Sequence, residues 1–329
     1  MNTLAPTLQT FFTDRLVRQR QASDHTIAAY RDAIKLLLTF AAERTAKPPS
    51  RLDLADLDAP LIGAFLDHLE HQRGNSVRTR NARLAAIHSL FRHAALHRPE
   101  DAAVIARVLA IPPKRFDHTL VTYLNESEVD ALLAACDQGT WTGRRDRALL
   151  MLACQTGLRA SELTHLNIID VHLGVGPHVS CFGKGRKHRI TPLTAGTVTL
   201  VSAWLTERGG GPDDPLFPTR RGTAMTRDAL EQRLTTHVTT AAPTCPSLHD
   251  KKITPHTMRH TAAMRLLAAG IDSSVIALWL GHENPATTQM YLHADLALKE
   301  KALARTAPQH TEPGRYQPCD ATLTFLDNL

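Results

Sequence analysis

Two histidines and an arginine near the carboxyl-terminal end of the sequence are spaced in a way that suits chemistry on a phosphate group. Arg259 is three positions after His256, and His260 is four positions after it. On a helix these three residues share one face. Thr254 and Pro255, directly before them, are typical of a helix start. The pattern therefore predicts that His256 and Arg259 lie near a helix N-terminus, where free N–H groups and the helix dipole favour an anion.

A third histidine and a tyrosine follow in the next forty residues. Gly270 predicts the end of the first helix, and Asp272 predicts the cap of a second. That second helix should stop at Gly281, which leaves His282 at its exit, and Tyr291 follows nine residues later. Three short helices packed on one core would then form a pocket for a phosphate and a phenol nucleophile.

Two upstream segments complete the pattern. The segment TGLRASEL carries Arg159 and Glu162, which form either an ordinary surface ion pair or an oriented guanidinium that grips phosphate oxygens. The segment GKGRKHR places Lys184 on a tight turn between two short predicted strands. In this order, the boxes over residues 157–291 resemble those of the tyrosine site-specific recombinases of phage-integrase and Xer type.

The resemblance implies a role for each matching residue. Arg159 and Arg259 would stabilise the charge that develops on the phosphate oxygens, and Tyr291 would attack the phosphorus. A phenol has a pKa of about 10, so the attack needs a base. The full expected set is Tyr291 as nucleophile, His256 as base, Lys184 rather than Lys187 as the acid for the leaving 5′-oxygen, Arg159, Arg259 and His282 as phosphate ligands, and Glu162 and His260 in supporting roles.

The two histidines of the first box do not indicate a metal site. His256 and His260 have the spacing of the HExxH zinc motif, but Thr257 stands where that motif has its glutamate. An acidic ligand cluster for Mg²⁺ is also not evident in the sequence. We therefore expect no metal and no other cofactor.

Composition narrows the class of protein. The chain has 329 residues, of which 38 are Lys or Arg and 32 are Asp or Glu, giving a formal charge of +6. This balance suits a polyanionic partner but says nothing about fold. Five cysteines without a CxxC pair indicate reduced thiols and a cytoplasmic protein. The sequence shows neither a signal peptide nor an apolar run long enough to span a membrane.

Apolar periodicity predicts a mainly α protein with a small antiparallel β-sheet in its second part. The first hundred or so residues resemble the helical core-binding domain of the family, and the resemblance implies a two-domain DNA clamp with the sheet in its catalytic domain. The expected divisions are a core-binding domain over residues 1–112, a linker over 113–122, a catalytic domain over 123–307 and a C-terminal tail over 308–329.

Basic side chains in the first domain and the linker are candidate DNA contacts. A helix from about residue 76 carries arginines with no acid until Glu100, whereas an ordinary solvated helix usually mixes both signs. The linker is proline-rich and basic, although an ordinary exposed hinge would look the same. The predicted contacts are Arg78, Arg80, Arg83, Arg92, Lys114 and Arg115.

The last ten residues contain an apolar cluster after a proline-rich stretch. Leu323, Phe325, Leu326 and Leu329 are too few to form a core of their own. In the resembling family, C-terminal segments pass between neighbouring protomers. The tail is therefore expected to dock on an adjacent protomer, with folding back onto its own domain as the alternative.

The expected activity is site-specific recombination of double-stranded DNA at inverted-repeat sites. A homo-tetramer on paired sites would cleave and rejoin strands through a 3′-phosphotyrosine and a Holliday junction. The alternative is a type IB-like DNA topoisomerase acting on one duplex, and a third reading is a DNA-binding module without activity. The biological role remains open among phage integration, transposition, cassette capture and dimer resolution, and accessory proteins are unknown.

Overall fold

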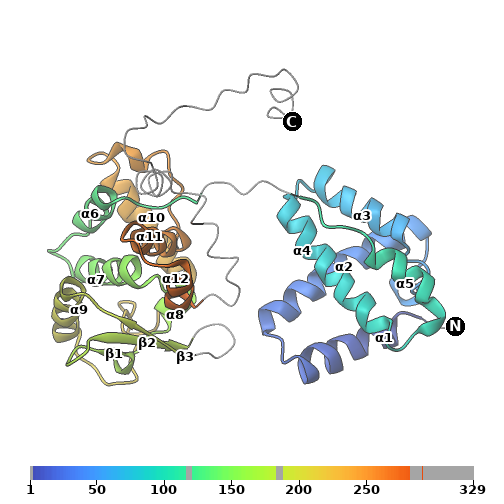
Figure 1. The fold of residues 1–329 in the computed structure, drawn as a ribbon, viewed down its shortest axis with the longest axis horizontal. Helices are drawn as coiled ribbons and strands as arrows, with labels where there is room; N and C mark the ends of the chain where they lie inside the picture. The colour runs from blue at the N-terminus through green and yellow to red at the C-terminus, as the bar shows by residue number, and fades with distance from the viewer. Residues whose placement is uncertain (1–2, 116–120, 183–187, 282–290, 292–329) are drawn as a thin grey trace, which may run out of the picture. The chain divides into compact units, whose positions relative to one another are not determined.

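The chain folds into two compact units, Met1–His118 and Thr119–Leu329, which we describe separately. Both units consist mainly of helices, and the second also contains a three-stranded antiparallel sheet. The prediction of a mainly α fold with a small antiparallel sheet is confirmed. The computed structural model, drawn in Figure 1, describes residues 3–115, 121–182, 188–281 and 291.

All the regular secondary structure in the described residues of the first unit is helical. Helices α2, α3 and α4 each begin at a polar residue whose side chain accepts a hydrogen bond from the backbone N–H three residues later. These caps are Ser23, Asp58 and Ser76. In chain order the elements are α1 (Ala5–Thr10), the π-helix η1 (Phe11–Gln19), α2 (Asp24–Thr45), η2 (Pro49–Arg51), α3 (Ala59–His71), α4 (Val77–Ala94), η3 (Pro99–Asp101) and α5 (Ala102–Leu109).

The core of this unit is shared by four helices. Leu37 of α2, Phe65 of α3, Ile87 of α4 and Val108 of α5 all belong to one buried apolar cluster. Helix α5, residues 102–109, was not expected from the sequence. It is stabilised by burial of Ile105 and Val108, and it packs against α3 and α4.

The first helix changes its winding after Thr10. Phe11 and Leu16 lie five residues apart in η1, and both side chains are completely buried. The backbone hydrogen bonds of a π-helix join residues five apart, so each turn holds more residues than a turn of an α-helix. Both side chains belong to one buried apolar cluster with Ile34 and Leu90.

The second unit contains the sheet and the remaining helices. No helix in the described ranges of the chain is both long enough and apolar enough to cross a membrane. The elements are α6 (Glu126–Ala134), α7 (Trp141–Thr156), α8 (Ala160–Thr164), η4 (Ile168–Asp170), β1 (Val171–His172), β2 (His178–Phe182), β3 (His188–Pro192), α9 (Ala195–Arg208), α10 (Arg227–Ala241), η6 (Pro246–Leu248), α11 (Pro255–Ala268) and α12 (Ser273–Leu280).

Strand register decides which side chains of the sheet face inward. The strand order is β1-β2-β3, and Cys181 of β2 lies directly opposite Arg189 of β3. Residues paired in this way project from the same face of a sheet. Cys181 is buried, whereas Phe182 and Ile190 are exposed on the opposite face. Arg189 therefore projects toward the interior of the unit.

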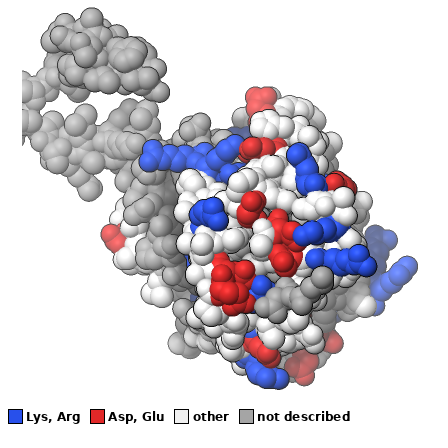
Figure 2. Space-filling model, turned by 90° about the vertical axis from the view of Figure 1, so that its right-hand side faces the viewer, with Lys and Arg blue, Asp and Glu red and all other residues white. Residues whose placement is uncertain are grey.

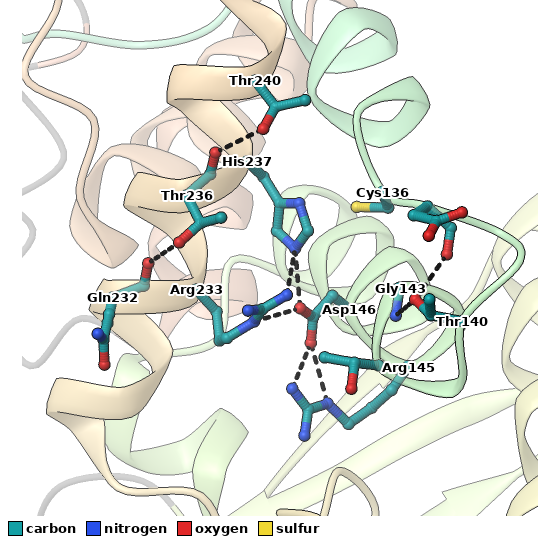
Figure 3. Close-up of polar contacts among 12 residues, drawn as sticks. Cys136, Thr140, Gly143, Arg145, Asp146, Gln232, Arg233, Thr236, His237 and Thr240 are labelled. Atoms are coloured by element: carbon teal, nitrogen blue, oxygen red, sulfur yellow. Dashed lines mark hydrogen bonds and ion pairs between the residues drawn. The ribbon is translucent and has the colours of Figure 1, made fainter.

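Helix α7 is the central helix of the second unit and lies against α9 and α11. A buried ion cluster also fixes it to α10, as Figure 3 shows. The carboxylate of Asp146 on α7 accepts hydrogen bonds from Arg145 and Arg233, and it lies 2.8 Å from Nε2 of His237. This cluster anchors α7, and Arg159 lies three residues after the last residue of that helix.

The division between the two units falls inside the segment expected as a linker, residues 113–122. Nζ of Lys114 lies 2.5 Å from Oε2 of Glu70, and the Asn81 amide donates to the Lys114 carbonyl. Val121, by contrast, is buried in an apolar cluster of the second unit. Both ends of this segment are thus packed against the unit they adjoin.

Candidate active site

Helix α11 begins at the cap expected from its sequence and carries a buried arginine. Thr254 Oγ1 accepts a hydrogen bond from the N–H of Thr257. Arg259 is only 2% exposed and donates to the carbonyls of Gly157 at 2.7 Å and Leu280 at 2.5 Å. These carbonyls lie at the C-terminal ends of α7 and α12, where the helix dipoles favour a cation.

Arg159 reaches the same place from the turn after α7. Its Nη1 lies 2.7 Å from Oε1 of Glu162, and its Nη2 donates to the Gly281 carbonyl at 2.9 Å. Glu162 also accepts a hydrogen bond from the Arg159 backbone N–H. The pair is therefore part of a network that ends at α12, and the reading as an isolated surface ion pair does not fit this geometry.

The charges in this network hold one another in place. Burial disfavours the ionised form of Glu162, but Arg189 and Arg159 hold the pKa of its carboxyl below the ordinary value. Burial, together with the charges of Arg159 and Arg189, lowers the pKa of Arg259 to about 10. Arg259 therefore stays protonated at neutral pH, and the cluster carries a net positive charge suited to an anion.

Tyr291 lies against this cluster in an apolar setting. Its side chain is 1% exposed and packs with Ala263, Met264 and Leu280. Its hydroxyl lies 3.0 Å from Nδ1 of His260. Burial raises the pKa of the phenol, and the charge of Arg259 opposes this shift. At neutral pH the phenol is thus protonated and needs a base before it can attack.

The geometry revises which histidine contacts the phenol. We expected His256 to take the phenol proton, but the structure places His260 against the hydroxyl. His256 lies one helical turn earlier, with its ring centroid 4.6 Å from that of His260. Burial, then the charges of Arg259 and Arg159, lower the pKa of His256, so this imidazole is neutral at neutral pH. The charges of Arg259 and Arg159 therefore act on His256, and the ring of His260 lies between its own turn and the phenol.

The site combines a phenol, an adjoining imidazole and two guanidiniums, and the sequence around these groups matches a known protein family. Residues 122–297 match the model of the phage integrase family, and residues 10–97 match the phage integrase N-terminal SAM-like domain. The chain belongs to the phage integrase family. It is a tyrosine recombinase, and the resemblance seen in its sequence is confirmed.

Relatives with similar sequences are named as integrases or recombinases. The putative integrase/recombinase y4rC of Sinorhizobium fredii is 53% identical over 326 residues, covering 99% of this chain and 98% of its own. The tyrosine recombinase XerC of Pelobacter propionicus is 35% identical over 304 residues, covering 92% and 95% of the two chains. Site-specific recombination is the activity that this family implies.

Solved structures show the same fold. The XerH recombinase bound to a palindromic difH substrate, in a post-cleavage complex, superposes with a TM-score of 0.68 at 25% identity, covering 87% of this chain and 81% of that one. The Tn1549 transposon integrase in complex with circular intermediate DNA gives a TM-score of 0.69 at 17% identity, covering 93% of this chain and all of that one. At 17% identity the second likeness concerns the fold alone.

The recombinase site expected from the sequence is only partly within the described residues. Lys184 lies between β2 and β3, and His282 directly follows Gly281, but both fall outside the described ranges. The structure brings together the other six expected residues, which are Arg159, Glu162, His256, Arg259, His260 and Tyr291.

The basic residues expected to contact DNA differ in how far their side chains are exposed to solvent. Arg78 and Arg92 are exposed on α4, and Arg115 is exposed beyond α5. Arg83 is half-buried, and burial lowers its pKa. Arg80 departs from the expectation, because its residue is only 6% exposed and its Nε lies 3.6 Å from Glu70. The α4 arginines therefore do not form one exposed face.

Charge on the surface is also less uniform than the net charge of the chain suggests. On the face drawn in Figure 2, Asp and Glu side chains lie among Lys and Arg side chains. The expected contact residue Lys114 is likewise paired with an acid, Glu70. A DNA surface in the first unit is therefore better assigned from individual exposed arginines than from overall charge.

One residue of the cluster was missed by the sequence analysis. Arg189 contributes a side chain only 9% exposed, and its Nη2 lies 2.7 Å from Oε2 of Glu162. A signal for it was present, because strand alternation places Arg189 and buried Thr191 on one face of β3. An arginine on the buried face of a strand requires a buried partner.

Proposed function

We propose that this tyrosine recombinase cleaves and rejoins double-stranded DNA at specific sites through a 3′-phosphotyrosine intermediate, and exchanges strands between two duplexes via a Holliday junction. One observation carries the proposal. A buried phenol, Tyr291, lies 3.0 Å from the imidazole of His260, beside a cluster with two guanidiniums on the residues expected to hold a phosphate.

The chemistry follows from these contacts. The Tyr291 hydroxyl gives its proton to His260 and attacks the phosphorus, and the 5′-oxygen leaves. Arg259 uses two of its five N–H donors on backbone carbonyls, which anchors the guanidinium while its other edge meets the phosphate oxygens. Arg159 and His282 bind the same oxygens. The free energy of the broken phosphodiester bond is retained in the phosphotyrosine ester, so rejoining needs no ATP.

The remaining parts of the proposal concern the leaving group and the assembly. Lys184, which lies between β2 and β3 in the sequence, gives the leaving 5′-oxygen its proton. Arg78, Arg92 and Arg115 contact the DNA backbone. Four protomers assemble on paired inverted-repeat sites. A type IB-like topoisomerase is less favoured, because the relatives are named recombinases and integrases. Residues 308–329, expected to dock between protomers, lie outside the described residues.

The test is to trap the covalent intermediate. A binding site is first selected from randomised duplexes with the purified protein, and a nick is then placed beside the cut so that the short cleaved piece diffuses away. We expect an adduct that survives denaturation and forms fully in EDTA, because the proposed cations are arginines and a lysine. Failure to form it in EDTA, with recovery in Mg²⁺, would contradict this mechanism. Strand transfer between two labelled duplexes separates a recombinase from a topoisomerase, which would only relax a supercoiled plasmid.

We expect Lys184→Ala to slow cleavage by about 10²–10⁴-fold, the usual contribution of a general acid. A substrate with sulfur in place of the 5′-bridging oxygen has a leaving group that needs no proton, so the variant should recover on it. Lys187→Ala, three residues further along the chain, serves as the control and should cleave both substrates nearly as wild type does. A Lys184 variant equally slow on both substrates would rule out the acid role.

We expect the His256 imidazole to stay neutral when the pH falls to 6.5, the ordinary pKa of histidine. Burial, and then the charges of Arg259 and Arg159, lower its pKa, so its protonated form accumulates only at lower pH. NMR titration of the histidine ring protons would test this, with His256→Asn identifying the His256 signal. A His256 signal whose midpoint lies at or above pH 6.5 would refute it.

A further inference from the structure

Arg189 makes polar contacts with three different segments of the second unit. Its Nη2 lies 2.7 Å from Oε2 of Glu162 on α8 and 3.6 Å from the sulfur of Cys181 on β2. Its Nη1 donates to the carbonyl of Leu280, the last residue of α12. A planar guanidinium can reach a carboxylate with one nitrogen and a carbonyl with the other, whereas a lysine ammonium offers a single point charge.

These contacts tie Arg189 to the arginine expected to bind phosphate. Glu162 bridges the two guanidiniums, with Oε1 on Arg159 and Oε2 on Arg189. The same two arginines donate to consecutive carbonyls, Arg189 to Leu280 and Arg159 to Gly281. The four groups thus form a closed ring, in which the position of each guanidinium is set by the other through Glu162.

The end of α12 is shaped around the same side chain. Gly281 has φ +64°, and a Cβ built on it would lie 3.1 Å from Nη1 and 3.5 Å from Cδ of Arg189. Glycine is therefore required here both by its backbone conformation and by the close approach of Arg189. The Leu280 carbonyl also accepts a hydrogen bond from Arg259 at 2.5 Å. Arg189 consequently packs on the turn that leads directly into His282.

We propose that Arg189 is a positioning residue for strand cleavage. It holds Glu162 and the end of α12 so that Arg159 is aimed at the scissile phosphate. This inference rests on the proposed phosphotyrosine chemistry. Without Arg189, the one hydrogen-bond partner that remains to Oε2 of Glu162 among the described residues is the Arg159 backbone N–H. Arg159 would then be free to follow a carboxylate that is no longer fixed.

The experiment measures single-turnover cleavage by Arg189→Gln and Arg189→Lys on two DNA substrates. One has an ordinary phosphodiester. The other has a methyl group in place of one non-bridging oxygen, so it is neutral before attack and one oxygen charge fewer has to be stabilised during cleavage. We expect Arg189→Gln to cleave the phosphodiester about 10–100-fold more slowly than wild type, because a misplaced catalytic group commonly lowers the rate by such a factor. On the methylphosphonate we expect most of this penalty to disappear, as it should for Arg159→Ala. Arg189→Lys, which keeps a charge beside Glu162, should lie between wild type and Arg189→Gln.

A double variant and a neighbouring control make the outcome decisive. If Arg189 acts through Arg159, adding Arg189→Gln to Arg159→Ala should slow phosphodiester cleavage little further, because the two effects are not additive. His188→Gln changes the adjacent, exposed residue of β3 and should cleave like wild type. Equal slowing of Arg189→Gln on both substrates, additive effects, or wild-type rates would overturn the inference. Absence of an adduct with wild-type protein would instead defeat the proposed function itself.

Should Arg189→Gln fail to fold, Arg189→Lys carries the same comparison. Its ammonium can keep the pairing with Glu162 but cannot also lie flat on Gly281 and reach the Leu280 carbonyl. We then expect a smaller phosphodiester penalty that again disappears on the methylphosphonate. A lysine variant that folds and shows the same penalty on both substrates would overturn the inference. Thermal unfolding and DNA affinity identify which variants are folded.

Discussion

Tyr291→Phe is expected to abolish covalent attachment to DNA while leaving DNA affinity within about twofold of wild type. The substitution removes only the phenol oxygen, which is the proposed nucleophile. The ring stays in its apolar cluster, so the loss in folding free energy should be about 1 kcal/mol, the usual contribution of one hydrogen bond. The measurement compares adduct formation on the nicked substrate with binding to the intact duplex.

Tyr123→Phe is the matched control for this variant. Tyr123 packs against the same apolar cluster as Tyr291, so its substitution perturbs similar surroundings without touching the proposed nucleophile. It should form adduct at nearly the wild-type rate. If the Tyr291 variant forms as much adduct as the control, another residue is the nucleophile and the proposed mechanism is wrong.

The parts of the site that the sequence predicts well are those fixed by local signals. Thr254 and Asp272 cap their helices as expected, and Gly281 ends α12 in a left-handed conformation. Each of these signals depends on a few neighbouring residues, because capping is a local interaction. The relation of His256 to Arg259 follows from helix geometry in the same way.

The parts that the sequence predicts poorly depend on contacts between distant segments. Arg189 and Glu162 are 27 residues apart, and only the packing of β3 against α8 and α12 brings them together. Arg80 looked like a surface arginine because spacing alone cannot reveal that Glu70 lies beside it. His260, rather than His256, contacts the phenol because of where the chain returns with Tyr291. Each case is decided by tertiary structure.

The ion cluster on α7 illustrates the same limit and leads to the largest expected effect on stability. Asp146 has a side chain only 2% exposed, and its two oxygens serve three partners, as Figure 3 shows. Oδ1 accepts from Nε and Nη2 of Arg145 at 2.9 and 2.7 Å. Oδ2 lies 2.7 Å from Nε of Arg233 and 2.8 Å from Nε2 of His237. The carboxylate is the shared counter-charge for groups on two helices.

Asp146→Ala should lower the free energy of unfolding by about 3–5 kcal/mol, because it leaves the buried Arg145 guanidinium without its carboxylate. Burial opposes ionisation of Asp146, but its partners His237, Arg145 and Arg233 hold the pKa below the ordinary 3.8. A lowered carboxyl pKa stabilises the fold above the unfolded value, and this contribution disappears as the pH falls through the folded one. The difference in free energy of unfolding between the variant and wild type should therefore reach its maximum at neutral pH and decrease below about pH 3.8.

Urea unfolding at pH 7 measures the loss, with Asp130→Ala as the control. Asp130 is an exposed aspartate on α6, so its substitution should change stability by no more than about 0.5 kcal/mol. A loss for Asp146→Ala no larger than for Asp130→Ala would mean that water or a shifted side chain replaces the carboxylate. The cluster would then not anchor α7 to α10. Because α7 ends next to Arg159, a true anchor also predicts that the folded fraction of Asp146→Ala cleaves DNA more slowly than wild type.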